Sequence, residues 1–289
     1  MADRLRYDSP MEPVQPILVA DLFPGLHAEL IALLRSLAPD DWSRPTVAGA
    51  WTVQDVAAHL LDVQLRRLSA QRDGARLPPP DSPLAGYADI VALLNRLNAE
   101  WVAVARRFSP RVLTDWLDLA GRQLAELMAT LDPFAPAMIS VAWAGEETSL
   151  QWFDVAREYT ELWHHQQQIR DAVEAPPLTA RKWLHPVLDT FLRALPHTYR
   201  EVEAADGTCV AVEIAGEAGG EWTLVREGPA WSLYAGATSQ ADCRVVMDQD
   251  TAWRRMTKGI TAEQALARME IVEKRALGEP VAKILAVMA

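Results

Sequence analysis

Apolar residues recur every three or four positions from Asp21 to Val173, which is the spacing of one buried face of an α-helix. Prolines, glycines and acidic residues interrupt this pattern at intervals, and they indicate connections between helices. The run LPPPDSP at 77–83 is the most pronounced interruption. The pattern predicts helices over 21–37, 52–63, 90–108, 112–131 and 149–173.

Successive helices joined by short connections favour an antiparallel helical bundle for this part of the chain. The second helix also carries a start signal. Thr52 is followed three residues later by Asp55, which resembles a capping box in which each side chain binds the other residue's backbone N–H.

The hydrophobic period changes in the C-terminal part. A further helix is expected over 178–204, after which apolar residues alternate with polar ones, as they do in strands with one buried face. The predicted strands, which we place in an antiparallel sheet, lie around 210–214, 222–225, 231–234 and 243–247. The chain then returns to helix at 251–258 and at 280–288. Between these two helices, Thr261 with Gln264 resembles a second capping box.

Length and breakers together predict two domains. A chain of 289 residues exceeds the usual size of one domain. The sequence Glu174-Ala175-Pro176-Pro177 separates the all-helical pattern from the mixed one. We therefore expect a helical domain over 14–177 and a small α+β domain over 178–289.

Charge and composition limit the classes of molecule that this protein is expected to bind. The net charge is −11, so the surface repels phosphate backbones, and we expect no nucleic acid partner. The N-terminus lacks the basic start and apolar core of a signal peptide, and no apolar run is long enough for a membrane span. We expect a soluble, cytoplasmic protein without a membrane partner.

Only Cys209 and Cys243 are present, and both fall in strand-like patterns. Buried, reduced thiols are the expected state of these two residues. Any thiol chemistry is therefore expected to use a thiol from outside the chain.

Three residues form a candidate metal site. Glu161 and His165 are four residues apart, so they share one face of the last predicted helix of the bundle. His59 lies beside the apolar face of the second helix. Two histidines and a carboxylate are a ligand set that holds a catalytic divalent ion and leaves a position for water or substrate.

The same residues have simpler interpretations. Glu161 and His165 can form an exposed pair on a solvated stripe of the helix, and His59 can be a hydrogen-bonded core residue. His164 competes with His165, but at three residues from Glu161 it is expected to point to one side. From the residues alone these alternatives stay open.

Other polar residues are weaker candidates for a functional site. His27, His185 and His197 are expected to be partly exposed helix residues. Arg254 and Arg255 could bind a substrate carboxylate, although a solvated helix face is the simpler interpretation. Tryptophans at helical spacing are expected in the core. The motifs of serine hydrolases, phosphate loops and dinucleotide-binding folds are absent from the sequence.

The segments AWTVQDVAAHL (50–60) and ELWHHQQQIRDAV (161–173) resemble the mycothiol-dependent maleylpyruvate isomerase family, within the DinB-like group of metal-binding four-helix bundles. The family patterns are W-[ST]-V-x-D-x-x-x-H-L and E-x-x-x-H. The segments ADCRVVMDQDTAWRRMTKG (241–259) and PVAKILAVM (280–288) resemble the family's sterol-carrier-like C-terminal domain.

The resemblance implies a DinB-like bundle and a metal site made by His59, Glu161 and His165, with zinc as the ion. It also implies mycothiol or another low-molecular-weight thiol as cofactor. In the implied reaction on a small-molecule substrate, thiolate adds to the double bond of a cis-enedioate, the new single bond rotates, and elimination leaves the trans isomer. Asp55 is a candidate to support His59.

One position departs from the family. Relatives often carry Asp three residues after the second histidine, where this chain has Gln168, which puts identical chemistry in question. A thiol S-transferase, a metal-dependent hydrolase and a non-catalytic small-molecule or lipid-binding protein are the alternative functions. The sequence assigns neither the substrate-binding arginines nor the oligomeric state.

Overall fold

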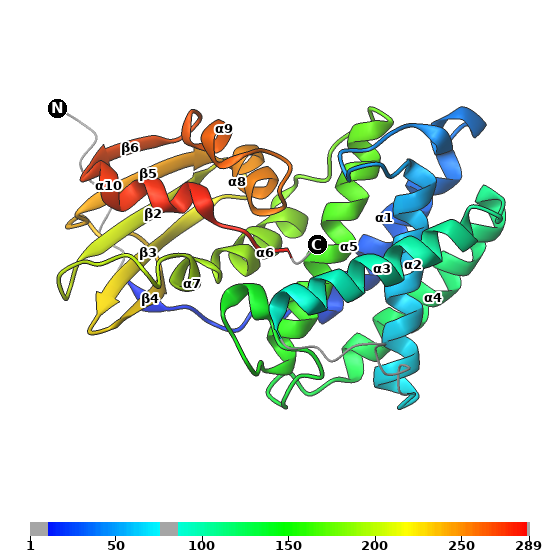
Figure 1. Cartoon of the computed structure of the whole chain (residues 1–289), viewed down its shortest axis with the longest axis horizontal. Coiled ribbons are helices and arrows are strands. Elements are labelled where there is room, and N and C mark those ends of the chain that lie inside the picture. Colours follow the sequence, from blue (N-terminus) through cyan, green and yellow to red (C-terminus); the bar gives the residue numbers. More distant parts are fainter. Residues whose placement is uncertain (1–10, 76–85, 288–289) are drawn as a thin grey trace.

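The computed structural model describes residues 11–75 and 86–287. A helical part, built mostly from the N-terminal half, lies beside a part built on a sheet (Figure 1). This arrangement confirms the predicted fold class of a helical bundle followed by an α+β unit. The proline-rich run predicted as a breaker at 77–83 lies outside the described residues.

Within the described residues, five long helices form the helical part. Four of them pack in a ring, in the order α1, α4, α2, α5, while α3 packs against the outside of α2. The bounds are α1 (Phe23–Ser36), α2 (Val53–Arg67), α3 (Tyr87–Ala105), α4 (Pro110–Thr130) and α5 (Gln151–Ala172).

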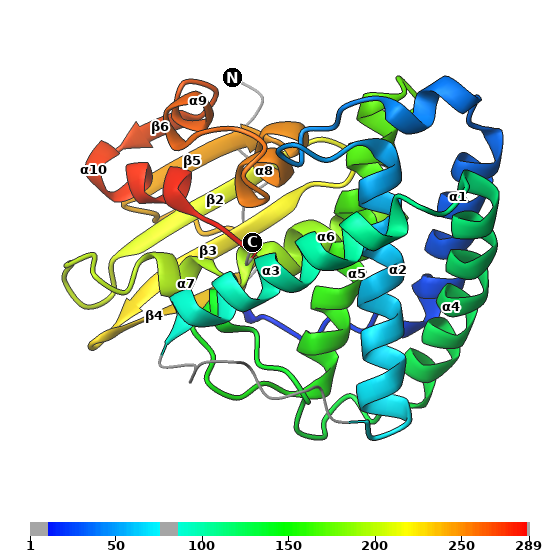
Figure 2. The ribbon, with the colours of Figure 1, turned by 45° about the vertical axis from the view of Figure 1, so that its right-hand side comes forward.

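The helix directions follow from the course of α3. This helix carries the chain back across the bundle, so α2 and α4 run in the same direction (Figure 2). The prediction of an antiparallel bundle was wrong for this neighbouring pair. The last helix, α5, runs opposite to α2. Two contacts show this: His59 near the middle of α2 meets Glu161, and Arg67 at its end meets Asp154, which is earlier in α5. Polar residues of α2 and α5 are thereby aligned in layers.

The start of α2 agrees with its sequence signal. The Thr52 hydroxyl accepts a hydrogen bond from the Asp55 N–H at 3.3 Å, and the Asp55 carboxylate accepts one from the Thr52 N–H at 3.0 Å. This capping box satisfies backbone donors that the first turn leaves free. Val53 and Val56 in that turn are fully buried. The capping hydrogen bonds and the buried valines therefore indicate the same starting point for α2.

The sheet has the strand order β1-β4-β3-β2-β5-β6. All its neighbouring strands pair antiparallel except β2 and β5, which are parallel, so the predicted antiparallel sheet is confirmed apart from this pair. The short edge strands β1 and β6 were not predicted. The bounds are β1 (Glu12–Pro13), β2 (Cys209–Ala215), β3 (Gly220–Glu227), β4 (Ala230–Ala235), β5 (Cys243–Asp248) and β6 (Glu270–Glu273).

The helices of the sheet part differ from the prediction in two places. The expected helix at 178–204 is two helices, and Pro196 explains the break because it has no N–H to continue the ladder. Within the described residues, the expected helix at 280–288 is a short 3₁₀ helix, Glu279–Lys283, after which the Ala286 N–H donates to the Met256 carbonyl. The bounds are α6 (Arg181–Leu192), α7 (Leu195–Thr198), α8 (Gln249–Met256), α9 (Ala262–Leu266) and α10 (Arg275–Gly278).

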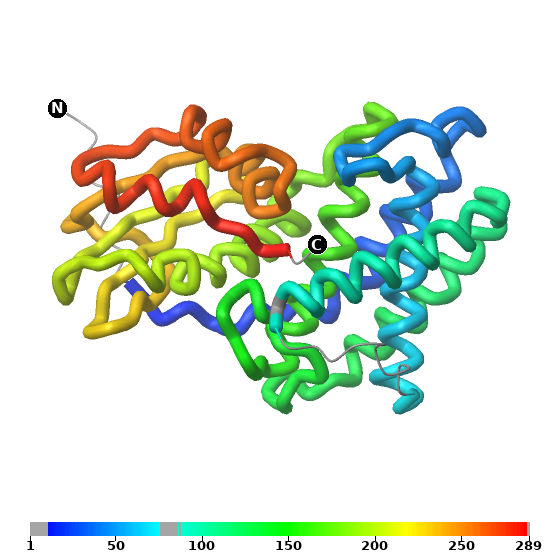
Figure 3. Tube along the Cα trace, viewed as in Figure 1, coloured from blue at the N-terminus to red at the C-terminus, as the bar shows by residue number. Residues whose placement is uncertain are grey.

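Helix α5 connects the two parts, and Figure 3 follows the chain from its end into the sheet part. The Trp163 indole N–H donates to the Leu178 carbonyl at 2.9 Å, and the Trp163 ring meets that of Trp253 edge to face at 5.4 Å. Arg254 of α8 pairs with Asp171 at the end of α5 at 2.7 Å. The buried apolar residues of both parts form one continuous cluster, so the core does not itself mark a boundary between two domains. The domain boundary after residue 177 stays a prediction.

None of the helices in the described ranges combines the length and apolar character needed to cross a bilayer. The cytoplasmic location stays a prediction. Both cysteines are free thiols, Cys243 buried and Cys209 half-buried. Burial raises the pKa of the Cys243 thiol to about 11, which keeps it protonated at neutral pH.

Candidate metal centre

The three residues predicted as metal ligands meet between α2 and α5. The Nε2 atoms of His59 and His165 lie 3.4 Å and 3.1 Å from the same Oε1 atom of Glu161. One potential ligand atom from each of the three lies within 4.8 Å of the others. The antiparallel course of α2 and α5 produces this meeting, because it brings the middle of α2 to the turn of α5 that carries Glu161 and His165.

The site is not on a solvated stripe. The side chains of His59 and His165 are 7% and 9% exposed, and that of Glu161 is 26% exposed. The simpler interpretation of an exposed helical pair was therefore wrong. The bundle encloses these side chains because α5 faces α2 on this side and packs against α6 on another. Glu161 retains the contact with solvent that a ligand needs to enter.

Gln168 fixes the orientation of His165. Its side-chain Oε1 lies 2.8 Å from Nδ1 of His165, one helical turn away. An amide oxygen only accepts, so Nδ1 is the protonated nitrogen in this contact. Nε2 is then the ring nitrogen that faces Glu161, and it is the atom that would bind a metal in place of its hydrogen bond with the carboxylate. The glutamine at this position thus makes the contact for which the family's aspartate would be expected.

His59 lies between two rings. Its ring centroid is 5.0 Å from that of Trp51 and 4.7 Å from that of His165. Its Nδ1 has no hydrogen-bond partner among the described residues. Burial, aided by the nearby charge of His165, lowers the pKa of His59, although its hydrogen bond with Glu161 acts in the opposite direction. A neutral imidazole, the form that binds metals, is favoured.

Glu161 carries the negative charge of the cluster. Burial by itself would raise the pKa of Glu161, but the charge of His165 and hydrogen bonds from His165 and His59 hold it well below its ordinary value. Two ring nitrogens and a carboxylate oxygen thus converge, and in the metal-free protein hydrogen bonds hold them together. A cation among them would satisfy all three, so the donor set fits a divalent metal.

His164 lies closer to the cluster than its spacing predicted. Its ring centroid is 3.9 Å from that of His165, and its Nδ1 is 3.9 Å from Oε2 of Glu161. The expectation that it points well to one side was therefore wrong. Burial and the charge of His165 lower the pKa of His164 to about 3, so it stays neutral at physiological pH. It is the third imidazole near the Glu161 carboxylate.

Asp55 supports the helix and not the cluster. Besides capping α2, it accepts two hydrogen bonds from the Arg106 guanidinium, both at 2.9 Å. Burial would raise the pKa of Asp55, but the hydrogen bonds from Arg106 and Thr52 outweigh it and lower the pKa. Its prediction as a partner of His59 is replaced by this role at the start of α2.

The two arginines of α8 take structural positions. Arg254 pairs with Asp171 and Asp250, and Arg255 donates to backbone carbonyls such as that of Ala282. Both guanidinium groups are therefore held within the protein, and neither is presented to a substrate carboxylate.

The other histidines lie away from the cluster. The prediction of a partly exposed His27 was wrong, because its side chain is 5% exposed and lies between α1 and α4. His185 and His197 are half-buried, as predicted.

A second layer of polar side chains joins α2 and α5. Its carboxylates are Asp154 and Glu158 of α5, and Arg67 of α2, the partner of Asp154, was not among the predicted site residues. Arg67 is 3% exposed and binds Asp154, which is fully buried, while Arg157 joins both carboxylates at 2.7 Å. Burial would lower the pKa of Arg157, but the charges of Glu158 and Asp154 raise it. Arg67 lies two turns from His59, a spacing that a search along α2 could have used.

Residues 23–170 match the family model described as the mycothiol maleylpyruvate isomerase N-terminal domain. The chain belongs to this family. The match runs from the start of α1 almost to the end of α5, so it includes every residue of the candidate centre. The family assigned from the two sequence motifs is therefore confirmed.

Two solved structures are similar to this mycothiol maleylpyruvate isomerase family member. They are a mycothiol-dependent maleylpyruvate isomerase and a histidine-to-alanine mutant of it. Each is 13% identical, covers 82% of this chain and 86% of the solved chain, and has a TM-score of 0.49. No curated protein matches the sequence. At this distance the two structures carry no conclusion about activity.

Proposed function

We propose that this protein is a metal-dependent enzyme that uses a low-molecular-weight thiol, mycothiol or a similar compound, to isomerise a small cis-enedioate. The observation that supports it best is the convergence of His59, Glu161 and His165 on one point between α2 and α5. Membership of the mycothiol maleylpyruvate isomerase family supports the thiol and the reaction class.

The three residues would hold the ion. Two imidazole nitrogens and one carboxylate oxygen suit zinc, and they leave a coordination position for an incoming ligand. Bound there, a divalent cation lowers the pKa of a thiol that approaches it and so supplies thiolate near neutral pH. Gln168 holds His165 with its Nε2 toward Glu161, which prepares the ligand set before the ion arrives.

The protein's own residues prepare the surroundings of the reaction. Trp51 covers one face of His59, and His164 lies beside His165, so bulk water is kept from the imidazoles. Glu161 keeps the site open to the outside. In the proposed reaction the thiolate sulfur bonds to one carbon of the double bond, the remaining C–C single bond rotates, and the C–S bond breaks again. Substrate and product therefore have the same composition, and the thiol is recovered.

Metal analysis with an activity assay tests this proposal. The purified protein should contain about one divalent ion per chain, as one three-ligand cluster requires, and should isomerise maleylpyruvate when mycothiol is added. His59→Ala and His165→Ala should each lose the ion and the activity. His185→Ala is the matched control, because His185 is a half-buried histidine that binds the Ala218 carbonyl in the sheet part.

Two results would count against the proposal. An ion content unchanged by His59→Ala and His165→Ala would remove the metal centre. A metal-loaded protein that leaves maleylpyruvate unchanged but alkylates the thiol with other electrophiles would replace the isomerase by a thiol S-transferase at the same centre.

A further inference from the structure

The outward face of α4 carries an exposed apolar stripe, made by Val112, Trp116 and Leu119. These residues follow one another at intervals of four and three, so they share one face of the helix. Their exposed fractions are 42%, 54% and 53%. The core side of the same helix is formed by other residues, such as Leu113 and Leu117, which are fully buried. A helix at the outside of a bundle normally needs one apolar face only, so the α4 stripe is a second one.

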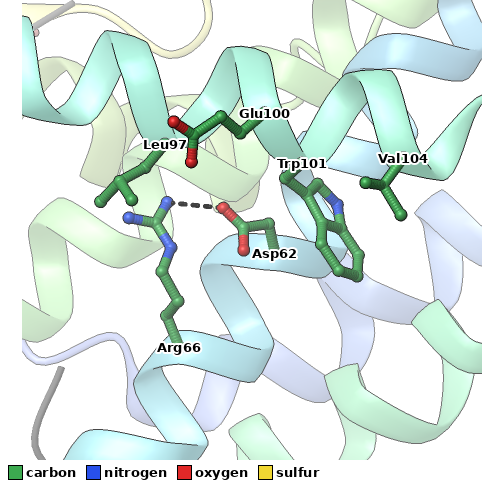
Figure 4. Close-up of a pocket in the computed structure, with 6 residues that line it drawn as sticks. All are labelled: Asp62, Arg66, Leu97, Glu100, Trp101 and Val104. Atoms are coloured by element: carbon green, nitrogen blue, oxygen red, sulfur yellow. Dashed lines mark ion pairs between the residues drawn. The ribbon is translucent and has the colours of Figure 1, made fainter. Parts of the chain in front are cut away.

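Aromatic rings extend the α4 stripe toward α3. The ring of Trp116 lies 6.0 Å from that of Phe108 in the turn between α3 and α4, and the Phe108 ring lies 6.4 Å from that of Trp101. Trp101 and Val104 are neighbours on α3, where they line a hollow of about 290 Å³ (Figure 4). Val104 is itself 42% exposed. An apolar surface that continues over two helices is typical of a contact with another protein.

Two opposite charges lie beyond the ends of the α4 stripe. Arg107 is exposed in the turn before α4, and Glu126 is exposed near the C-terminal end of α4. Neither forms an ion pair with another residue of the ranges 11–75 and 86–287. Glu126 follows Leu119 by seven residues, or two helical turns, so it lies on the face of the stripe. Asp115, nearer the centre, is already paired with Arg111 at 3.8 Å.

This arrangement is complementary to itself when one copy is reversed. In two copies of α4 that pack antiparallel with Trp116 at a two-fold axis, a residue before Trp116 faces the residue equally far after it in the other copy. Val112 then faces the turn that carries Leu119, and Arg107 faces the turn that carries Glu126. Because a two-fold contact is isologous, each of these contacts is made twice.

We propose that α4 is a homodimer interface, in which the α4 stripe packs antiparallel on that of a second copy and Arg107 pairs with Glu126 of the partner subunit. A second copy fits better than an unrelated protein, since a single surface supplies the apolar centre and both matching charges. The candidate metal centre has no residue in this surface, so the inference is independent of the proposed function.

Sedimentation velocity of the full chain at roughly 1 to 100 µM tests the proposal. Wild type should be a dimer in the upper part of this range. Trp116→Glu should raise the dissociation constant about 30-fold or more, as expected for loss of a central aromatic residue. Phe134→Ser is the matched control, because Phe134 is an aromatic residue that is 60% exposed in the connection between α4 and α5. It should leave the dissociation constant unchanged.

Charge reversal identifies the paired side chains. Arg107→Glu and Glu126→Arg should each be monomeric where wild type is dimeric, because each homodimer brings like charges together twice. An equal mixture of the two variants should form dimers again, since both contacts in the mixed dimer then join opposite charges. A change within one chain does not predict this recovery on mixing.

Three results would count against the proposal. A wild-type protein that stays monomeric over the whole range would overturn it, whatever else binds the α4 stripe. A dimer with the same dissociation constant in wild type and Trp116→Glu would use another surface. Charge variants that stay monomeric when mixed would overturn the pairing of Arg107 with Glu126 and with it the antiparallel register.

Discussion

Gln168 and His165 form a hydrogen bond of 2.8 Å between the amide Oε1 and the ring Nδ1. The contact selects the ring nitrogen that faces Glu161, and its acceptor is a neutral amide. An amide oxygen withdraws the Nδ1 proton less strongly than a carboxylate, so His165 should be a weaker donor to a metal than it would be with aspartate at position 168.

The first prediction concerns Gln168. Gln168→Ala should weaken zinc binding roughly 10- to 100-fold, the range found when supporting partners of metal ligands are removed. Gln168→Asp should bind zinc at least as tightly as wild type. Both affinities can be measured by competition with a chromophoric chelator.

Gln167→Ala is the control for the first prediction. Gln167 is a neighbouring buried glutamine whose side chain donates to Asp171 and accepts from the Leu178 N–H. It should lower stability without changing zinc affinity. Equal zinc affinities for Gln168→Ala and Gln167→Ala would show that the contact with His165 does not tune the site.

The second prediction is a dependence of stability on pH in the metal-free protein. The pKa of His164 is about 3 in the folded protein against an ordinary value of 6.5. Between these values the unfolded chain binds a proton that the folded protein does not, so this residue makes stability fall as the pH falls below about 6.5. The contribution is at most about 1.4 kcal/mol per pH unit.

His164→Gln should remove that contribution. Urea unfolding of wild type and variant at several pH values between 7 and about 5.5, above most of the range where carboxylates titrate, gives the dependence of stability on pH for each protein. The variant should lose less stability than wild type over this range. Parallel slopes would mean that His164 is as protonated in the folded protein as in the unfolded chain.

The third prediction concerns the buried pair of Arg67 and Asp154. Arg67→Ala leaves a fully buried carboxylate with one cationic partner fewer, and it should lower the free energy of unfolding by about 3–5 kcal/mol. The double variant Arg67→Met with Asp154→Leu should recover much of this loss, because no uncompensated charge remains. Urea titration of the single and double variants measures both values, and a double variant no more stable than Arg67→Ala would contradict the explanation.

These features were not equally visible in the sequence. Helical period placed Glu161 and His165 on one face, and a capping box placed the start of α2, because both depend on residues close in the chain. That His59 meets Glu161 depends on the direction of α5 relative to α2, which local pattern does not contain. The family motif supplied that link.

The errors have related physical reasons. The side position expected for His164 came from spacing on an ideal helix, but ring size and side-chain direction bring its Nδ1 within 3.9 Å of Glu161. Strands β1 and β6 are too short to show alternation. The parallel pairing of β2 with β5 depends on the crossover between them. The role of Gln168 depends on the orientation of an amide, which no spacing encodes.

The last prediction concerns the close packing of α1 on α4 at Gly121. A Cβ atom added to this glycine would lie 2.0 Å from Cε1 of His27, so the buried imidazole would have to move. Gly121→Ala should therefore lower the free energy of unfolding by about 1–3 kcal/mol, as overpacking does, even though alanine favours helix. Gly86→Ala adds an atom with nothing within 4 Å, so it causes no overpacking. Because Gly86 is the N-cap of α3, where alanine is less favourable than glycine, it should cost about 0.5–1 kcal/mol. Urea unfolding of both variants measures these changes in stability. If Gly121→Ala were as stable as wild type, His27 would have room to move aside, and this close contact would not limit the packing of α1 on α4.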